Sequence, residues 1–224
     1  MNKISNSPTL LDKTVDDLLN GFTGIAMSDK AGFAISANRL LRGLRSGKFL
    51  TILNEEWKRF QVEGKISTNY EFSESYYDSL SEILEYLDTD IPNHKIFNVL
   101  KDIFIKSAIE NQKEDLLPIQ FLKIAKSLDE GELIVLSTIY RLYKNKAYAN
   151  SKTRLETAHN YLELIAKESG LKYNSLVEIH EQRLISKKML SARKYSDGSG
   201  VEIEPFFRLT SLGKSFCEYI ENYE

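Results

Sequence analysis

The stretch from Tyr161 to Tyr219 constrains the fold of this chain more than any other segment. Its pattern predicts, in order, a helix, a tight turn, a second helix, a β-hairpin and a closing helix. The remainder of the chain predicts a series of helices that lead up to it. We therefore predict a mainly α protein with a helical region over residues 1–118 and a second domain over residues 119–224, which contains the one small β-hairpin.

The turn within this stretch has the spacing of a helix-turn-helix unit. Such a unit needs a small residue where its two helices pack closely, and a glycine four residues later because the turn requires a positive φ. Ala166 and Gly170 have this spacing. We expect Leu176 and Ile179 to direct the following helix back onto the core.

Capping boxes predict where two helices of this half begin. Asp129 and Glu132 predict the start of a strongly apolar helix over residues 131–143. Ser175 and Glu178 have the same spacing and predict the start of the second helix of the turn unit. In both cases the side chains would satisfy backbone N–H groups that the helix itself leaves unpaired.

A hairpin and a closing helix complete the pattern. Residues 189–195 predict one strand, residues 197–200 a turn and residues 201–209 the returning strand. The motif Leu-Thr-x-x-Gly at residues 209–213 then leads into a helix with Phe216 and its apolar neighbours.

Residues 129–220 together resemble bacterial winged helix-turn-helix regulators of the MarR and PadR type, in which the wing is followed by a Leu-Thr-x-x-Gly helix start. The sequence departs from the resemblance at Arg183, where these families usually have glycine. The resemblance implies binding to double-stranded DNA, with the helix over residues 175–184 in the major groove. The implied DNA-binding residues are Asn174, Ser175 and Gln182 for base contacts, and Lys187, Lys188, Arg193 and Lys194 for phosphates.

The charge of this half does not favour DNA. Glu178 and Glu181 place two negative charges on the helix that would meet a polyanion, and residues 151–224 carry 11 basic and 11 acidic residues. DNA-binding domains usually show a basic excess. A protein-interaction or dimerisation module is therefore an equal alternative.

The front half predicts helices over residues 36–50, 51–62, 79–87, 96–109 and 119–128. Gly64 and Pro118 mark the end of one helix and the start of another. The predicted core residues are Leu80, Ile83, Leu84, Leu87, Phe97, Leu100, Ile103, Phe104, Phe121, Leu122 and Ala125. Leu53, Trp57 and Phe60 are predicted to be either core residues or interface anchors.

Two neighbouring blocks of opposite charge lie in this half. Residues 30–65 hold eight basic and three acidic residues, whereas residues 71–90 hold seven acidic residues and no basic one. We expect the blocks to pair with each other, rather than the basic block to bind nucleic acid.

No pattern of catalytic residues is present. The three histidines have no metal-ligand spacing, and the segment from Gly43 to Lys48 lacks the spacing of a phosphate-binding loop. Cys217 is the single cysteine, so an intrachain disulfide is excluded and we expect a small core residue there. We predict no enzymatic activity, no metal and no cofactor.

Three functional hypotheses follow. The first is a DNA-binding transcriptional regulator in which residues 1–128 sense a signal or form a dimer. The second is a non-enzymatic protein-interaction adaptor that uses the winged helix and the helical front half as binding surfaces. The third is a membrane-surface protein that uses residues 1–48. The polar first residues and the lack of any run of eighteen apolar residues predict a cytoplasmic protein without a transmembrane segment.

Overall fold

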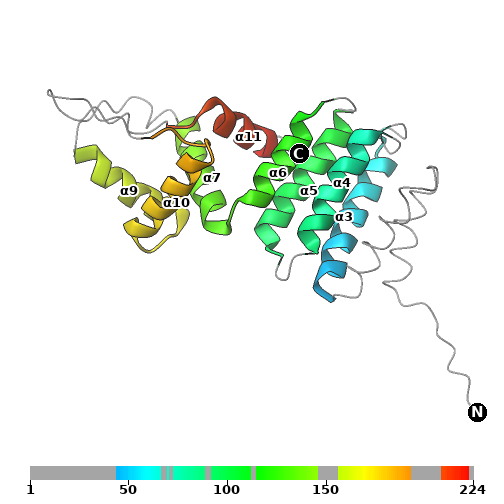
Figure 1. Cartoon of the computed structure of the whole chain (residues 1–224), viewed down its shortest axis with the longest axis horizontal. Coiled ribbons are helices and arrows are strands. Elements are labelled where there is room, and N and C mark those ends of the chain that lie inside the picture. The colour runs from blue at the N-terminus through cyan, green and yellow to red at the C-terminus, as the bar shows by residue number, and fades with distance from the viewer. Residues whose placement is uncertain are drawn as a thin grey trace, which may run out of the picture. The chain divides into compact units, whose positions relative to one another are not determined.

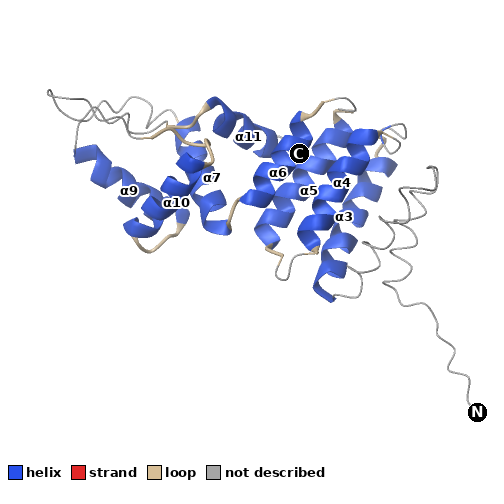
Figure 2. Ribbon diagram, in the orientation of Figure 1, coloured by secondary structure: helices blue, strands red, loops and turns tan. Residues whose placement is uncertain are grey.

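The protein is mainly helical, as predicted (Figure 1). Within the part of the chain that the computed structural model describes, there are eight helices and no β-strand (Figure 2). One isolated antiparallel bridge joins Leu190 to Leu209. The chain divides into two compact units, residues 1–127 and 128–224. The described residues are 44–66, 70, 73–88, 92–111, 115–145, 156–192 and 208–221.

The first unit is a set of helices packed side by side (Figure 1). Its helices are α3 (Leu44–Val62), α4 (Glu74–Leu87), α5 (His94–Ile109) and α6 (Leu117–Ser127). α5 packs against each of the other three, and α4 also packs against α6. This central position explains why α5 is apolar around most of its circumference.

The predicted core of the first unit is confirmed, because its eleven residues are buried. Leu53, Trp57 and Phe60 are buried as well, so they belong to this core. Trp57 of α3 stacks on Phe104 of α5, with ring centroids 5.0 Å apart. The hydroxyl groups of Tyr70 and Ser107 lie 2.7 Å apart, so the polar end of this buried tyrosine has a partner.

Two helices of this unit are longer than predicted. α3 is one continuous helix from Leu44, across the predicted break between residues 50 and 51, because no helix-breaking residue lies there. α4 begins at Glu74 rather than at Ser79, because the Ser73 side chain caps it by accepting the N–H of Tyr76. The predicted end of α3 is confirmed, since Gly64 has a φ of +70°.

The acidic block pairs in part with α6. Glu82 and Glu85 both accept hydrogen bonds from Lys126, and Lys123 lies 3.8 Å from Glu82. Within the basic block, Glu56 pairs with Lys101 of α5. These acidic residues are therefore matched by lysines outside residues 30–65, which the prediction of two facing blocks did not foresee.

The second unit is organised around one helix, α7 (Glu130–Lys144). α9 (Glu156–Ser169), α10 (Asn174–Ser186) and α11 (Ser211–Glu221) all pack against α7. The predicted capping box at the start of α7 is confirmed: the Asp129 side chain accepts the N–H of Glu132, and the Glu132 side chain accepts the N–H of Asp129. The division between the units falls after α6, later than the domain boundary predicted between residues 118 and 119, because α6 packs on α4 and α5.

Candidate functional site

The turn between α9 and α10 has the conformation that the sequence predicts. Gly170 adopts a φ of +73°, and a Cβ placed on it would meet no atom within 4 Å. The glycine is therefore needed for its backbone conformation rather than for space. Ala166 is buried between the packed helices, also as predicted.

The predicted cap of α10 is wrong. The helix begins at Asn174, one residue before Ser175, so Ser175 lies inside the first turn and cannot occupy the N-cap position. Tyr173 stands at the N-cap and makes no side-chain capping bond. The helix starts instead with the N–H of Leu176 donating to the carbonyl of Tyr173, at 3.1 Å.

The predicted buried face of α10 is also wrong. Val177, Glu181 and Leu184 are buried, at spacings of four and three residues, whereas Leu176 and Ile179 are exposed. A glutamate can lie on the buried face here because Arg208 pairs with it, and both side chains are almost completely buried. Sequence reasoning placed Glu181 outside because a charged residue is rarely buried without a partner, and this partner lies 27 positions further along the chain.

Asp129 connects the start of α7 to α10. Its Oδ2 accepts a hydrogen bond from Nη1 of Arg183 at 2.6 Å, and its Oδ1 lies 3.5 Å from Nδ1 of His180. Partial burial alone would raise the pKa of Asp129. The hydrogen bond from the Glu132 N–H, the electrostatic influence of His180, and the hydrogen bond and charge of Arg183 together outweigh that effect and hold the pKa of Asp129 below its usual value. Arg183, the departure from the winged-helix pattern, thus has a structural partner.

Lys187 has a structural partner as well. Its Nζ donates to the carboxylate of Glu132, whose side chain is only 1% exposed. Leaving that buried carboxylate without its cation would be costly. The lysine predicted to contact phosphate is therefore held by α7.

The Leu-Thr-x-x-Gly motif joins the bridge to α11. Oγ1 of Thr210 donates to the carbonyl of Lys188 at 2.6 Å and accepts the N–H of Gly213 at 3.0 Å. A Cβ on Gly213 would lie 2.1 Å from the carbonyl oxygen of Met189. The threonine caps α11, and the glycine lets the helix approach the backbone of the bridged segment.

The predicted DNA-binding residues are not all available to a ligand. Ser175, Gln182 and Lys188 are exposed, and Asn174 is half-buried. Lys187 is half-buried in its ion pair with Glu132. The remaining two, Arg193 and Lys194, lie outside the described residues, as does most of the predicted hairpin.

Exposed apolar side chains concentrate at the start of α10. Tyr173 is 55% exposed, Leu176 38% and Ile179 48%. They follow one another at intervals of three residues, so they are neighbours on the helix surface. Only two other large hydrophobic residues of the described chain, Val62 and Leu116, are exposed. We call Tyr173, Leu176 and Ile179 the α10 patch. The exposure of Tyr173 agrees with the sequence, whereas Leu176 and Ile179 were predicted to lie in the core.

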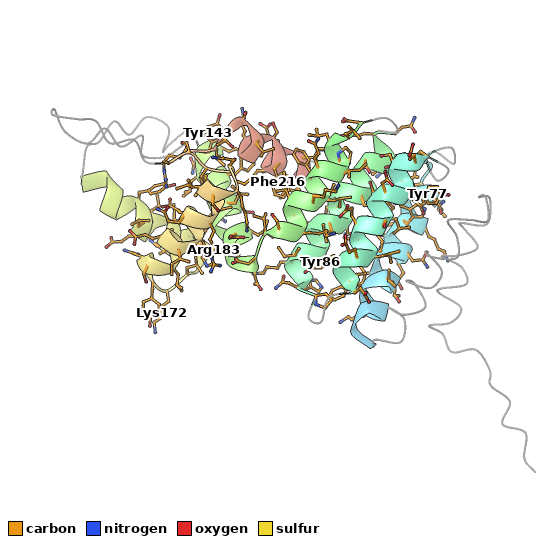
Figure 3. All side chains as sticks on the ribbon, in the orientation of Figure 1. Tyr77, Tyr86, Tyr143, Lys172, Arg183 and Phe216 are labelled. Carbon is orange, nitrogen blue, oxygen red and sulfur yellow. The ribbon has the colours of Figure 1, made fainter. Side chains whose placement is uncertain are left out.

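A cation borders the α10 patch at its N-terminal end. The Nζ of Lys172 lies 5.2 Å from the centre of the Tyr173 ring. Figure 3 shows Lys172 projecting from the turn before α10, and Arg183 further along the same helix. The patch is thus apolar in its middle and bordered by positive charge.

Neither a metal site nor a membrane span is found in the residues that the structure describes. These residues contain no group of three or more histidine, cysteine, aspartate or glutamate side chains that could hold a metal ion. Of the described helices, none combines the length and apolarity needed to cross a bilayer. No protein-family model, curated protein or solved structure matches the chain.

Proposed function

We propose that this chain is a non-enzymatic protein-interaction adaptor whose second unit is a winged helix that binds another protein through the α10 patch. The observation that carries the proposal is the clustering of exposed Tyr173, Leu176 and Ile179 at the N-terminal end of α10. Contiguous exposed apolar surface of this kind commonly marks a protein interface. Covering it would remove apolar area from water, at about 25 cal/mol per Å² buried.

The order of elements supports the winged helix. α7, α9 and α10 precede the bridge between Leu190 and Leu209, and α11 follows it. In a winged helix the third helix of the core is the one presented to a ligand. α10 is the third of these helices in the chain, so a partner would contact its exposed residues.

The identity of the exposed residues favours a protein over DNA. Tyrosine is enriched at the energetic centres of protein interfaces, and aliphatic neighbours complete a dry contact. A DNA-reading helix instead presents polar side chains that match base edges. On the exposed face of α10, Leu176 and Ile179 occupy positions where a DNA-reading helix would present polar side chains.

DNA binding is the second candidate function. Ser175 and Gln182 are exposed on α10, and Lys188 is exposed immediately after it, so part of the predicted DNA-binding set is accessible. Lys187 forms an ion pair with buried Glu132, so this lysine is less available for the phosphate contact that was predicted for it. We therefore place a regulator that binds double-stranded DNA second.

Site-specific photocrosslinking tests the proposal. A benzophenone amino acid would replace Ile179 in one variant and Ser137, an exposed residue of α7, in a matched control. Both full-length proteins would be irradiated in the cells that produce this chain, and the adducts identified by mass spectrometry. We expect protein adducts at residue 179 that are absent at residue 137 and are lost when Leu176→Lys is added.

The same experiment can refute the proposal. Nucleic-acid adducts at residue 179, together with salt-dependent duplex binding that Lys188→Ala weakens, would establish the DNA-binding candidate instead. A lack of any adduct specific to residue 179 would remove both candidates from this face of α10.

A further inference from the structure

The charges around the α10 patch point to the chemistry of its partner, and this inference rests on the proposed function. We infer that the patch binds an amphipathic helix of another protein, with apolar residues in the middle of the contact face and carboxylates at both ends of it. Apolar residues spaced at helical intervals dock in this way on an exposed apolar surface.

Cations stand at both ends of α10. Lys172 lies just before the helix and Lys188 just after it, and both are exposed. The 13 residues of α10 lie between them, a length of about 20 Å at the rise of an α-helix. A partner helix of about the same length would meet one lysine near each of its ends.

The centre of this face carries no exposed carboxylate. Arg183 follows Ile179 by four positions, so it extends the same face, and its side chain is 54% exposed although it pairs with Asp129. Glu178 is the only exposed acidic residue of α10. It lies two positions from Leu176, and residues two apart on a helix do not face each other. The cations Lys172, Arg183 and Lys188 therefore outnumber the one exposed carboxylate of α10, that of Glu178.

A helix with acidic ends matches this pattern better than a nucleic acid does. Phosphates repeat at regular intervals along a duplex, so they would pair with Lys172 and Lys188 but would leave Leu176 and Ile179 without apolar contacts. An acid-flanked amphipathic helix satisfies the cations and covers the apolar side chains together. Oppositely charged borders also favour one orientation and faster association.

A display library of helical peptides tests the inference on the full-length chain. The peptides would carry apolar residues at helical spacing in the middle, with acidic, basic and neutral residues randomised at both ends. We expect selection against the wild-type protein to enrich Asp and Glu at the ends. Binding of the enriched peptide, measured by fluorescence anisotropy, should fall at least tenfold with Ile179→Lys and several-fold with Lys172→Glu/Lys188→Glu.

Charge reversal provides the decisive control. A peptide with Lys in place of its terminal carboxylates should bind the wild-type protein weakly. It should bind the Lys172→Glu/Lys188→Glu variant with the affinity that the acidic peptide has for the wild type. Lys48→Glu, at an exposed lysine of α3, should leave the affinity unchanged. Circular dichroism of each variant would establish that its helices are intact.

The possible failures can be told apart. Enrichment of neutral or basic peptide ends would refute the inference that the partner is acidic, and so would an affinity that Lys172→Glu/Lys188→Glu does not change. If Ile179→Lys still abolished peptide binding, the protein-binding function of α10 would stand. A library that yields no Ile179-dependent binder would also overturn the acidic helix. Salt-sensitive duplex DNA binding at α10 alongside that result would overturn the proposed function as well.

Discussion

The imidazole ring of His180 lies against Gly131 so closely that a Cβ on this glycine would be 2.2 Å from both Cε1 and Nε2 of the ring. Gly131 is in the first turn of α7, and His180 is on α10. The contact fixes how near α10 approaches the start of α7. It also explains a glycine at a helical position where alanine would ordinarily be more stable.

Gly131→Ala should therefore destabilise the protein despite the higher helix propensity of alanine. Forcing a methyl group into this contact displaces the ring or the helix, which typically costs about 1–3 kcal/mol. Urea denaturation followed by circular dichroism would measure the loss. In the His180→Ala background the same substitution should be neutral or stabilising, and equal losses in both backgrounds would refute a steric origin.

The buried ion pair between Glu181 and Arg208 gives a second prediction. Both side chains are nearly inaccessible to solvent, so Glu181→Ala would leave the guanidinium buried without its partner. Losing one member of a buried pair costs about 3–5 kcal/mol. Replacing both with apolar residues, Glu181→Leu/Arg208→Met, should cost much less. A double variant that is less stable than the single one would contradict this reasoning.

Asp129 gives a prediction about pH. Its pKa in the folded protein is held below the ordinary value of 3.8, so its ionised form stabilises the fold. That contribution is fully present above the unfolded-state pKa and is lost as the pH falls through the lower folded-state pKa. Asp129→Asn keeps a residue suited to the N-cap. It should remove part of the decline in stability below about pH 4, as measured by thermal melts from pH 2 to pH 7. An unchanged acid profile would show that Asp129 makes no such contribution.

The parts of the fold that were predicted correctly depend on local signals. The core of the first unit follows helical periodicity, and the start of α7 follows the spacing of Asp129 and Glu132. Gly170 predicts the turn because the positive φ that the turn requires is favourable for glycine whatever its neighbours are. The wing and the contacts of Arg193 and Lys194 lie outside the described residues, so they stay predictions.

The interior of α10 could not be predicted because its decisive interactions are distant in sequence. Periodicity allowed either of two apolar faces, one with Leu176 and Ile179 and the other with Val177 and Leu184. The structure buries the second face, on which Glu181 would be unfavourable without Arg208. Leu176 and Ile179 of the exposed face were visible as apolar residues in the sequence, but they were assigned to the core.

Two matched substitutions in α10 test which face is buried. Leu184 is fully buried and Leu176 is 38% exposed, so the same change to alanine should have unequal effects. Leu184→Ala should lower the free energy of unfolding by about 2–5 kcal/mol, because it leaves a cavity in the core. Leu176→Ala should change it by less than about 0.5 kcal/mol, as surface substitutions usually do. Urea denaturation under identical conditions would compare them, and a larger loss for Leu176→Ala would mean that the face predicted from sequence is the buried one.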